Sequence, residues 1–176
     1  MKRNIFKKVT FLSVILLFGL LVKAHGLDKT KTLILFKIGR SKDANEIFYE
    51  VNITPDGSLD LKEPIEIYWI KYTKYGKTEP LTKIQQHFAY GLKFFEVTPE
   101  RAEFQFVSYS KRTLKLRKTF DGSYGVFTET DGKEVKLERV FIQIDGGTFW
   151  FPKITWVEIH AKIPEVNQLV VEVIKP

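Results

Sequence analysis

The chain has no cysteine among its 176 residues, and it has only one methionine and three histidines. The absence of cysteine excludes disulfide bonds, a thiol nucleophile, thiolate metal ligands and lipid attachment through a thiol. His25, His87 and His160 lie far apart and show no metal-ligand spacing, so we expect no metal site. A domain of this kind must derive its stability from its hydrophobic core.

Familiar catalytic and phosphate-binding motifs are missing as well. The sequence contains no GxSxG, GxGxxG or Walker motif. We therefore expect no cofactor, assign no catalytic residue, and favour a non-enzymatic role. Hydrolysis of glycans by a pair of carboxylates stays open as the alternative, because it requires only two acids about 5–10 Å apart.

The N-terminus has the pattern of a secretory signal peptide. A basic start is followed by an uncharged apolar run over 9–22, and Val22 and Ala24 place cleavage before His25. The run is shorter than the roughly 20 residues that span a bilayer. We predict a signal peptide over 1–24, a single β-rich domain over 25–176 with no membrane anchor after cleavage, and a periplasmic or secreted location.

This cleavage would change the meaning of the formal charge of +7. It removes five basic residues and no acidic one, so that 23 Lys and Arg remain against 21 Asp and Glu. A nearly balanced domain gives little support to a nucleic-acid partner, and we expect none. The excess of aromatic residues, 14% of the chain, is then the more unusual property.

Alternating apolar and polar residues predict strands through most of the domain. A capping box at Thr82–Gln85 and a stop at Tyr90–Gly91 predict one short helix. Short Asp-Gly connections favour antiparallel hairpins. We predict an all-β, mainly antiparallel single domain, either a β-sandwich or a flattened β-barrel. The predicted strands are 32–38, 46–53, 65–72, 92–97, 102–109, 113–120, 124–130, 134–144, 154–161 and 168–174.

Several segments together are similar to a known family. The more specific ones are Ala89-Tyr90-Gly91-Leu92 and the run GGTFWFP over 146–152; LFKIGRS at 35–41 and EPLTKIQ at 79–85 also contribute. With these segments the chain resembles the bacterial family called domain of unknown function 4833 over nearly all of the mature part. The resemblance implies a short exported protein without an assigned activity, and it carries no catalytic residue across.

The candidate ligand-binding residues are mainly aromatic. They are Trp69 in a strand with apolar residues on both faces, Tyr90 after the helix, Trp150 in the GGTFWFP run, and Arg40 after the first strand. Such residues suit a glycan, an apolar small molecule or an envelope protein partner. The alternatives are core packing for the rings and, for Arg40, pairing with Asp43 or Glu46.

Two further polar groups have simpler interpretations. Glu158 and His160 share one strand face, which we expect to be solvated, opposite Val157, Ile159 and Ala161. Lys115 and Arg117 belong to the one local basic cluster and also fit an exposed strand face, with Leu114 and Leu116 opposite.

Overall fold

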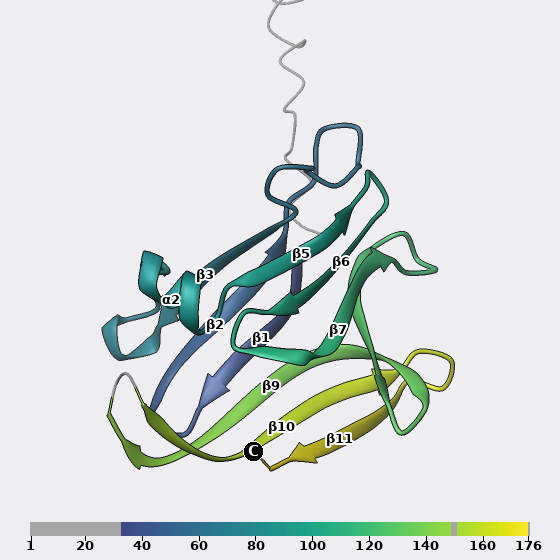
Figure 1. Ribbon diagram of the computed structural model, residues 1–176. Helices are drawn as coiled ribbons and strands as arrows, with labels where there is room; N and C mark the ends of the chain where they lie inside the picture. The colour runs from purple at the N-terminus through teal and green to yellow at the C-terminus, as the bar shows by residue number, and fades with distance from the viewer. Residues whose placement is uncertain (1–32, 149–150, 176) are drawn as a thin grey trace, which may run out of the picture. The chain divides into compact units, whose positions relative to one another are not determined.

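The computed structural model describes residues 33–148 and 151–175, which form strands and two short helical segments. The helical segments are η1 (Tyr72–Lys74) and α2 (Lys83–Phe88). The strands (Figure 1) are β1 (Ile34–Arg40), β2 (Asp43–Val51), β3 (Ile65–Lys71), β4 (Lys77–Pro80), β5 (Leu92–Val97), β6 (Arg101–Phe106), β7 (Tyr109–Lys118), β8 (Tyr124–Thr130), β9 (Lys133–Gly147), β10 (Pro152–Ile163) and β11 (Gln168–Ile174).

One sheet contains all of these strands, and β9 is the strand at which it branches. The first part of β9, Lys133–Lys136, pairs antiparallel with β8, whereas Arg139–Ile142 pairs parallel with β1. The opposite edge of β9 pairs with β10, which pairs with β11. A branch of β1–β4, a branch of β5–β8 and the β10–β11 hairpin are therefore joined through β9 (Figure 1).

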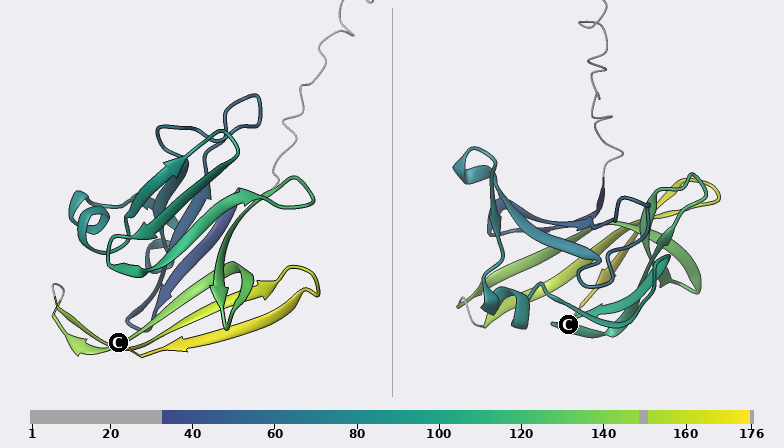
Figure 2. Two further views of the ribbon diagram at one scale, coloured as in Figure 1. Left: turned by 45° about the vertical axis from the view of Figure 1, so that its right-hand side comes forward. Right: turned by 90° about the horizontal axis from the view of Figure 1, so that it is seen from above.

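The β1–β4 and β5–β8 branches face each other across the core. Phe36 of β1 stacks on Tyr49 of β2 at 4.2 Å between ring centroids, and both rings meet Phe106 of β6 edge-on at 6.0 and 5.8 Å. Because β1 and β6 are not neighbours in the sheet, these contacts show one branch lying over the other. The sheet curls into a half-barrel, as Figure 2 shows from two sides.

The predicted all-β fold with one short α-helix is confirmed. The sheet is mixed rather than mainly antiparallel, because β1 and β9 run parallel. A parallel pair needs a long crossover connection, and here most of the domain lies between the two strands. The spacing of neighbouring strands indicated the hairpins but not this distant pairing.

The helix α2 begins with the predicted capping box. Thr82 Oγ1 accepts a hydrogen bond from the backbone N–H of Gln85 at 3.3 Å, and Gln85 Oε1 accepts one from that of Thr82 at 3.0 Å. After the helix the chain folds back tightly at Gly91, where a Cβ atom would lie only 1.8 Å from the carbonyl oxygen of Gln86. Glycine is therefore required at this position, and together these contacts fix the place of Tyr90.

Most strand predictions agree with the structure, and β5, β8 and β11 have the predicted bounds. The strand β4 was not predicted, since Lys77–Pro80 is polar and ends in proline. Among the described residues it is an edge strand that pairs only with β3. The predicted signal peptide and its cleavage point lie outside the described residues. Within 33–148 and 151–175, no helix has the length and apolar character needed to cross a bilayer.

Candidate functional site

The inner face of β1, β9, β10 and β11 carries two rows of side chains that run across the strands. Residues paired in register point to the same side of a sheet, as do residues two apart on one strand. One row, from β1 to β11, consists of Ile38, Val140, Ile159 and Glu172. The next row consists of Arg40, Ile142, Val157 and Ile174. The face is thus aliphatic, with Arg40 at its β1 end and Glu172 at its β11 end.

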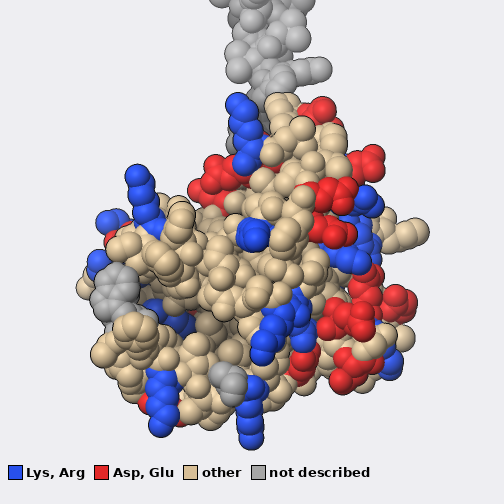
Figure 3. Space-filling model, in the orientation of Figure 1, with Lys and Arg blue, Asp and Glu red and all other residues tan. Residues whose placement is uncertain are grey.

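The side chains of these rows, except Glu172, form one wall of a cavity of about 480 Å³. Other parts of its lining come from Phe106 of β6, Leu114 of β7, and Ile84 and Phe88 of α2. Phe88 is 71% exposed, which places it at the rim. In Figure 3 the surface is hollowed between α2 and the β9–β10 hairpin, and Lys and Arg side chains border the hollow. This volume is typical of small-molecule binding sites.

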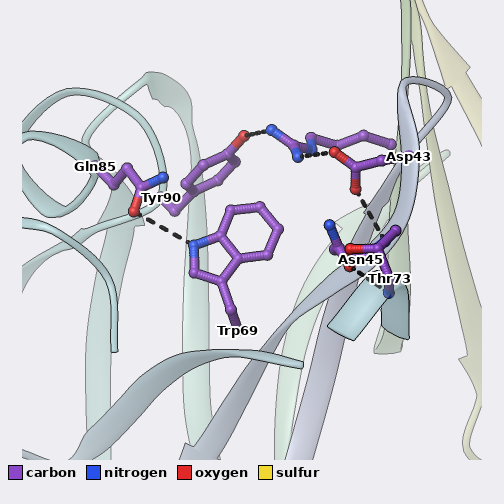
Figure 4. A network of polar contacts seen from close by, with 7 residues as sticks. Asp43, Asn45, Trp69, Thr73, Gln85 and Tyr90 are labelled. Carbon is purple, nitrogen blue, oxygen red and sulfur yellow. Dashed lines mark hydrogen bonds and ion pairs between the residues drawn. The ribbon is translucent and has the colours of Figure 1, made fainter. Parts of the chain in front are cut away.

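Arg40 is the centre of a polar cluster at the β1 end of the cavity. Its Nη1 donates a hydrogen bond to the Tyr90 hydroxyl at 3.1 Å, and its Nη2 forms an ion pair with Asp43 at 2.6 Å. Its guanidinium carbon lies 4.7 Å from the centroid of the Trp69 ring, a cation–π contact. Trp69 in turn meets Tyr90 edge-on at 5.6 Å. Three of the four candidate residues therefore form one cluster (Figure 4).

The members of this cluster have different positions relative to the cavity. Arg40 and Tyr90 line it, whereas Trp69 is only 2% exposed and does not. The Trp69 Nε1 donates to Gln85 Oε1 at 3.3 Å, which connects the indole to α2 (Figure 4). Trp69 therefore supports Arg40 and Tyr90 from the core side.

Two further sets of hydrogen bonds hold the cluster in place. The Tyr49 hydroxyl donates to the backbone carbonyl of Tyr90 at 2.7 Å. Burial, and secondarily the nearby Tyr90, raises the pKa of Tyr49 well above its usual value, so this hydroxyl stays a neutral donor. On the other side, Asp43 accepts from the Asn45 backbone, and the Asn45 side chain accepts from Thr73 (Figure 4). The carboxylate that pairs with Arg40 is thereby oriented.

A second arginine lines the cavity toward β11. Arg112 Nη2 pairs with Glu172 at 2.6 Å, and Thr130 Oγ1 donates to the other oxygen of this carboxylate at 2.8 Å. These contacts connect β7 and β8 to β11 across the inner face. The predicted strands 102–109 and 113–120 left Arg112 in a connection, so this role was not predicted. The signal was present, because Arg112 continues the alternation of the buried Leu114 and Leu116 toward the core.

The other candidates have simpler surroundings. Trp150 lies outside the described residues. Glu158 and His160 contact each other at 2.9 Å on the outer face of β10, opposite the buried Ile159 and Ala161. Arg117 forms an ion pair with Glu134 at 2.6 Å on the exposed side of β7.

The acidic residues near the cavity do not form a catalytic pair there. No Asp or Glu of the described chain belongs to its lining. Hydrogen bonds lower the pKa of three exposed aspartates, Asp56, Asp60 and Asp145, the opposite of what a general acid requires. In the part of the chain that the structure covers, no group of three or more His, Asp or Glu is arranged to hold a metal ion.

Comparisons with known proteins address the family rather than the activity. No curated protein and no solved structure matches the chain. The model of one family, described as Domain of unknown function (DUF4833), matches residues 36–173, a range that includes nearly all of the curled sheet, Arg40, Trp69 and Tyr90. The chain belongs to the DUF4833 family.

Proposed function

We propose that this protein is an exported, non-enzymatic binding module that holds a single small molecule of apolar or amphipathic character. The observation that supports it is the cavity of about 480 Å³ between the inner face of β9–β11 and the β6, β7 and α2 side chains. Burial of apolar surface is the main source of affinity in such sites, at roughly 25 cal/mol per Å².

The lining favours an apolar ligand over the other ligand classes considered. Aliphatic side chains dominate it, and its charged side chains are Arg40, Lys42 and Arg112. A glycan would need hydrogen-bonding groups distributed along its whole length. A carboxylate-pair hydrolase would need two acids in the lining, which holds none from the described residues.

The neutral dye Nile red provides a direct test, because its fluorescence rises in an apolar site. We expect the wild-type protein to bind the dye at one site and to release it when dodecanol is added. Ile154 lines the cavity and is 37% exposed, so Ile154→Trp should narrow the opening and weaken dye binding. The matched control is Val171→Trp on β11, which is 53% exposed and outside the lining. Absence of dye binding to the wild type, or equal loss in both variants, would contradict the proposal.

Export is supported by the basic start, the uncharged run over 9–22 and the small residue before His25. The full chain should be produced in a bacterium with its own N-terminus and recovered from the periplasm and medium. N-terminal sequencing should then find His25 or a neighbouring residue first. Recovery of only the uncleaved chain, inside the cell, would contradict this part of the proposal.

A further inference from the structure

The lining of the cavity includes three cationic side chains, Arg40, Lys42 and Arg112, and no carboxylate of the described residues. Arg112 is balanced by Glu172, and Arg40 by Asp43. Lys42 is exposed, and within the described part of the chain its ammonium group has no hydrogen bond or ion pair. The β1 end of the cavity therefore has one positive charge more than its ion pairs neutralise.

The same end of the cavity has unused hydrogen-bond donors. A guanidinium carries five N–H groups, and Arg40 uses one on each terminal nitrogen, toward Tyr90 and Asp43. The Arg40 Nε is buried and has no hydrogen-bond partner. Each terminal nitrogen, Nη1 and Nη2, therefore keeps one hydrogen that is free to bind a ligand. The Tyr90 hydroxyl accepts from Arg40 and has no described acceptor for its own hydrogen. These donors are held in place by Trp69, Asp43 and Tyr49, and they suit an acceptor with two oxygens.

From this arrangement, and on the basis of the proposed function, we propose that the ligand is a single-chain amphiphile with a carboxylate head group. The carboxylate binds at Arg40, Lys42 and Tyr90. Its alkyl chain lies along the row of Ile142, Val157 and Ile174, which begins beside Arg40 and crosses β9 and β10 to β11. At the far end of the cavity Arg112 is already neutralised by Glu172, so it does not compete with Arg40 and Lys42 for the carboxylate of the ligand.

Three amphiphiles with the same tail separate head-group recognition from tail binding. Binding of dodecanoate, dodecanol and dodecyltrimethylammonium would be measured by titration calorimetry at concentrations below micelle formation. We expect dodecanoate to bind about tenfold more tightly than dodecanol, since hydrogen bonds to charged groups are the stronger ones, and the cation to bind most weakly. Equal affinities, or tighter binding of the alcohol, would overturn the head-group assignment while leaving the proposed function intact. If none of the three binds, the proposed function itself is wrong.

Charge reversal at one exposed residue locates the head group. Lys42→Glu should weaken dodecanoate about tenfold and leave dodecanol unchanged, because the tail contacts are elsewhere. Lys115→Glu, on the exposed face of β7 outside the lining, is the matched control and should change neither. Tyr90→Phe should weaken dodecanoate by roughly threefold and serves as the second variant, since it keeps the ring. Unchanged dodecanoate affinity in both Lys42→Glu and Tyr90→Phe would overturn the assignment.

Discussion

The Tyr90 hydroxyl accepts a hydrogen bond from Arg40 Nη1 at 3.1 Å, although the two residues are 50 positions apart in sequence. This contact joins the end of β1 to the segment that leaves α2, and both residues line the cavity. Each partner has a second contact that fixes its position. Arg40 forms an ion pair with Asp43, and the Tyr49 hydroxyl donates a hydrogen bond to the backbone carbonyl of Tyr90. The polar end of the site is therefore organised before any ligand binds.

The Tyr49 hydroxyl should contribute strongly to this organisation. Tyr49→Phe leaves the Tyr90 carbonyl without this donor in a buried setting, and we expect a loss of about 1–3 kcal/mol of unfolding free energy. Tyr124→Phe is the matched control, because the Tyr124 hydroxyl donates to the backbone carbonyl of Gly57 over a longer distance, 3.3 Å, from a half-buried position, and its loss should cost less. Urea denaturation measures both, and an equal cost would contradict the assigned role.

Glycine at position 91 should be far less replaceable than glycine at an open turn. Gly91→Ala places a methyl group against the Gln86 backbone, and we expect a cost of about 3 kcal/mol or more. Gly57 has φ +81 but open space around it, so Gly57→Ala should cost only about 1–2 kcal/mol. Thermal unfolding of the two variants compares them, and similar melting temperatures would argue against the close approach at Gly91.

The Arg112–Glu172 ion pair should stabilise the contact of β7 with β11 beside the cavity. Their side chains are 19% and 25% exposed, so a double-mutant cycle with Arg112→Leu and Glu172→Gln should give a coupling of about 1–3 kcal/mol. The Arg101–Glu96 pair, at 61% and 41% exposed, provides the comparison and should give at most about 1 kcal/mol. A coupling no larger at Arg112–Glu172 than at Arg101–Glu96 would mean that burial does not strengthen the inner pair.

Acid should remove a stabilising contribution from Asp60. The backbone N–H groups of Glu63 and Lys62 donate to its carboxylate and lower its pKa. A carboxyl group whose pKa is lowered on folding stabilises the fold above its unfolded pKa of about 4, and this contribution disappears as pH falls through the folded value. Asp60→Asn should therefore lower the melting temperature at neutral pH, and the difference from wild type should shrink in acid.

The control for this pH dependence is Asp131→Asn. Asp131 lies in an exposed turn, and its side chain has no hydrogen bond among the described residues. The variant should follow the wild-type pH profile. A difference between Asp60→Asn and wild type that persists unchanged in acid would show that the carboxylate charge is not involved.

Local patterns predicted most of the strands because alternation reports which face of a strand is buried. The turn between β8 and β9 was also predictable from local sequence. Asp131-Gly132 adopts φ values of 51° and 71°, as an Asp-Gly hairpin turn requires. Arg40 and Tyr90 were selected for their chemistry, and Asp43 was named as a partner of Arg40, as the structure shows. The role of Trp69 behind them depends on packing between α2 and β3.

The remaining features depend on distant contacts. The parallel pairing of β1 with β9 has no local signature, because either strand presents the same alternation with another neighbour. Arg112 fell in the connection between the predicted strands 102–109 and 113–120, whereas β7 begins at Tyr109 and so includes it. The carboxylate that compensates it, Glu172, comes from the last strand of the domain.

The branching of the sheet at β9 also governs the order in which the domain is completed. The bonds between Ser41 and the backbone of Ile144 span 103 positions of the chain, and the neighbouring β1–β9 pairing closes a loop of similar length. Contacts over such separations form slowly, because the loop entropy must be overcome first. One edge of the first strand therefore stays open to other chains until β9 arrives. The wall that carries Arg40 is therefore complete only when β9 has paired with β1.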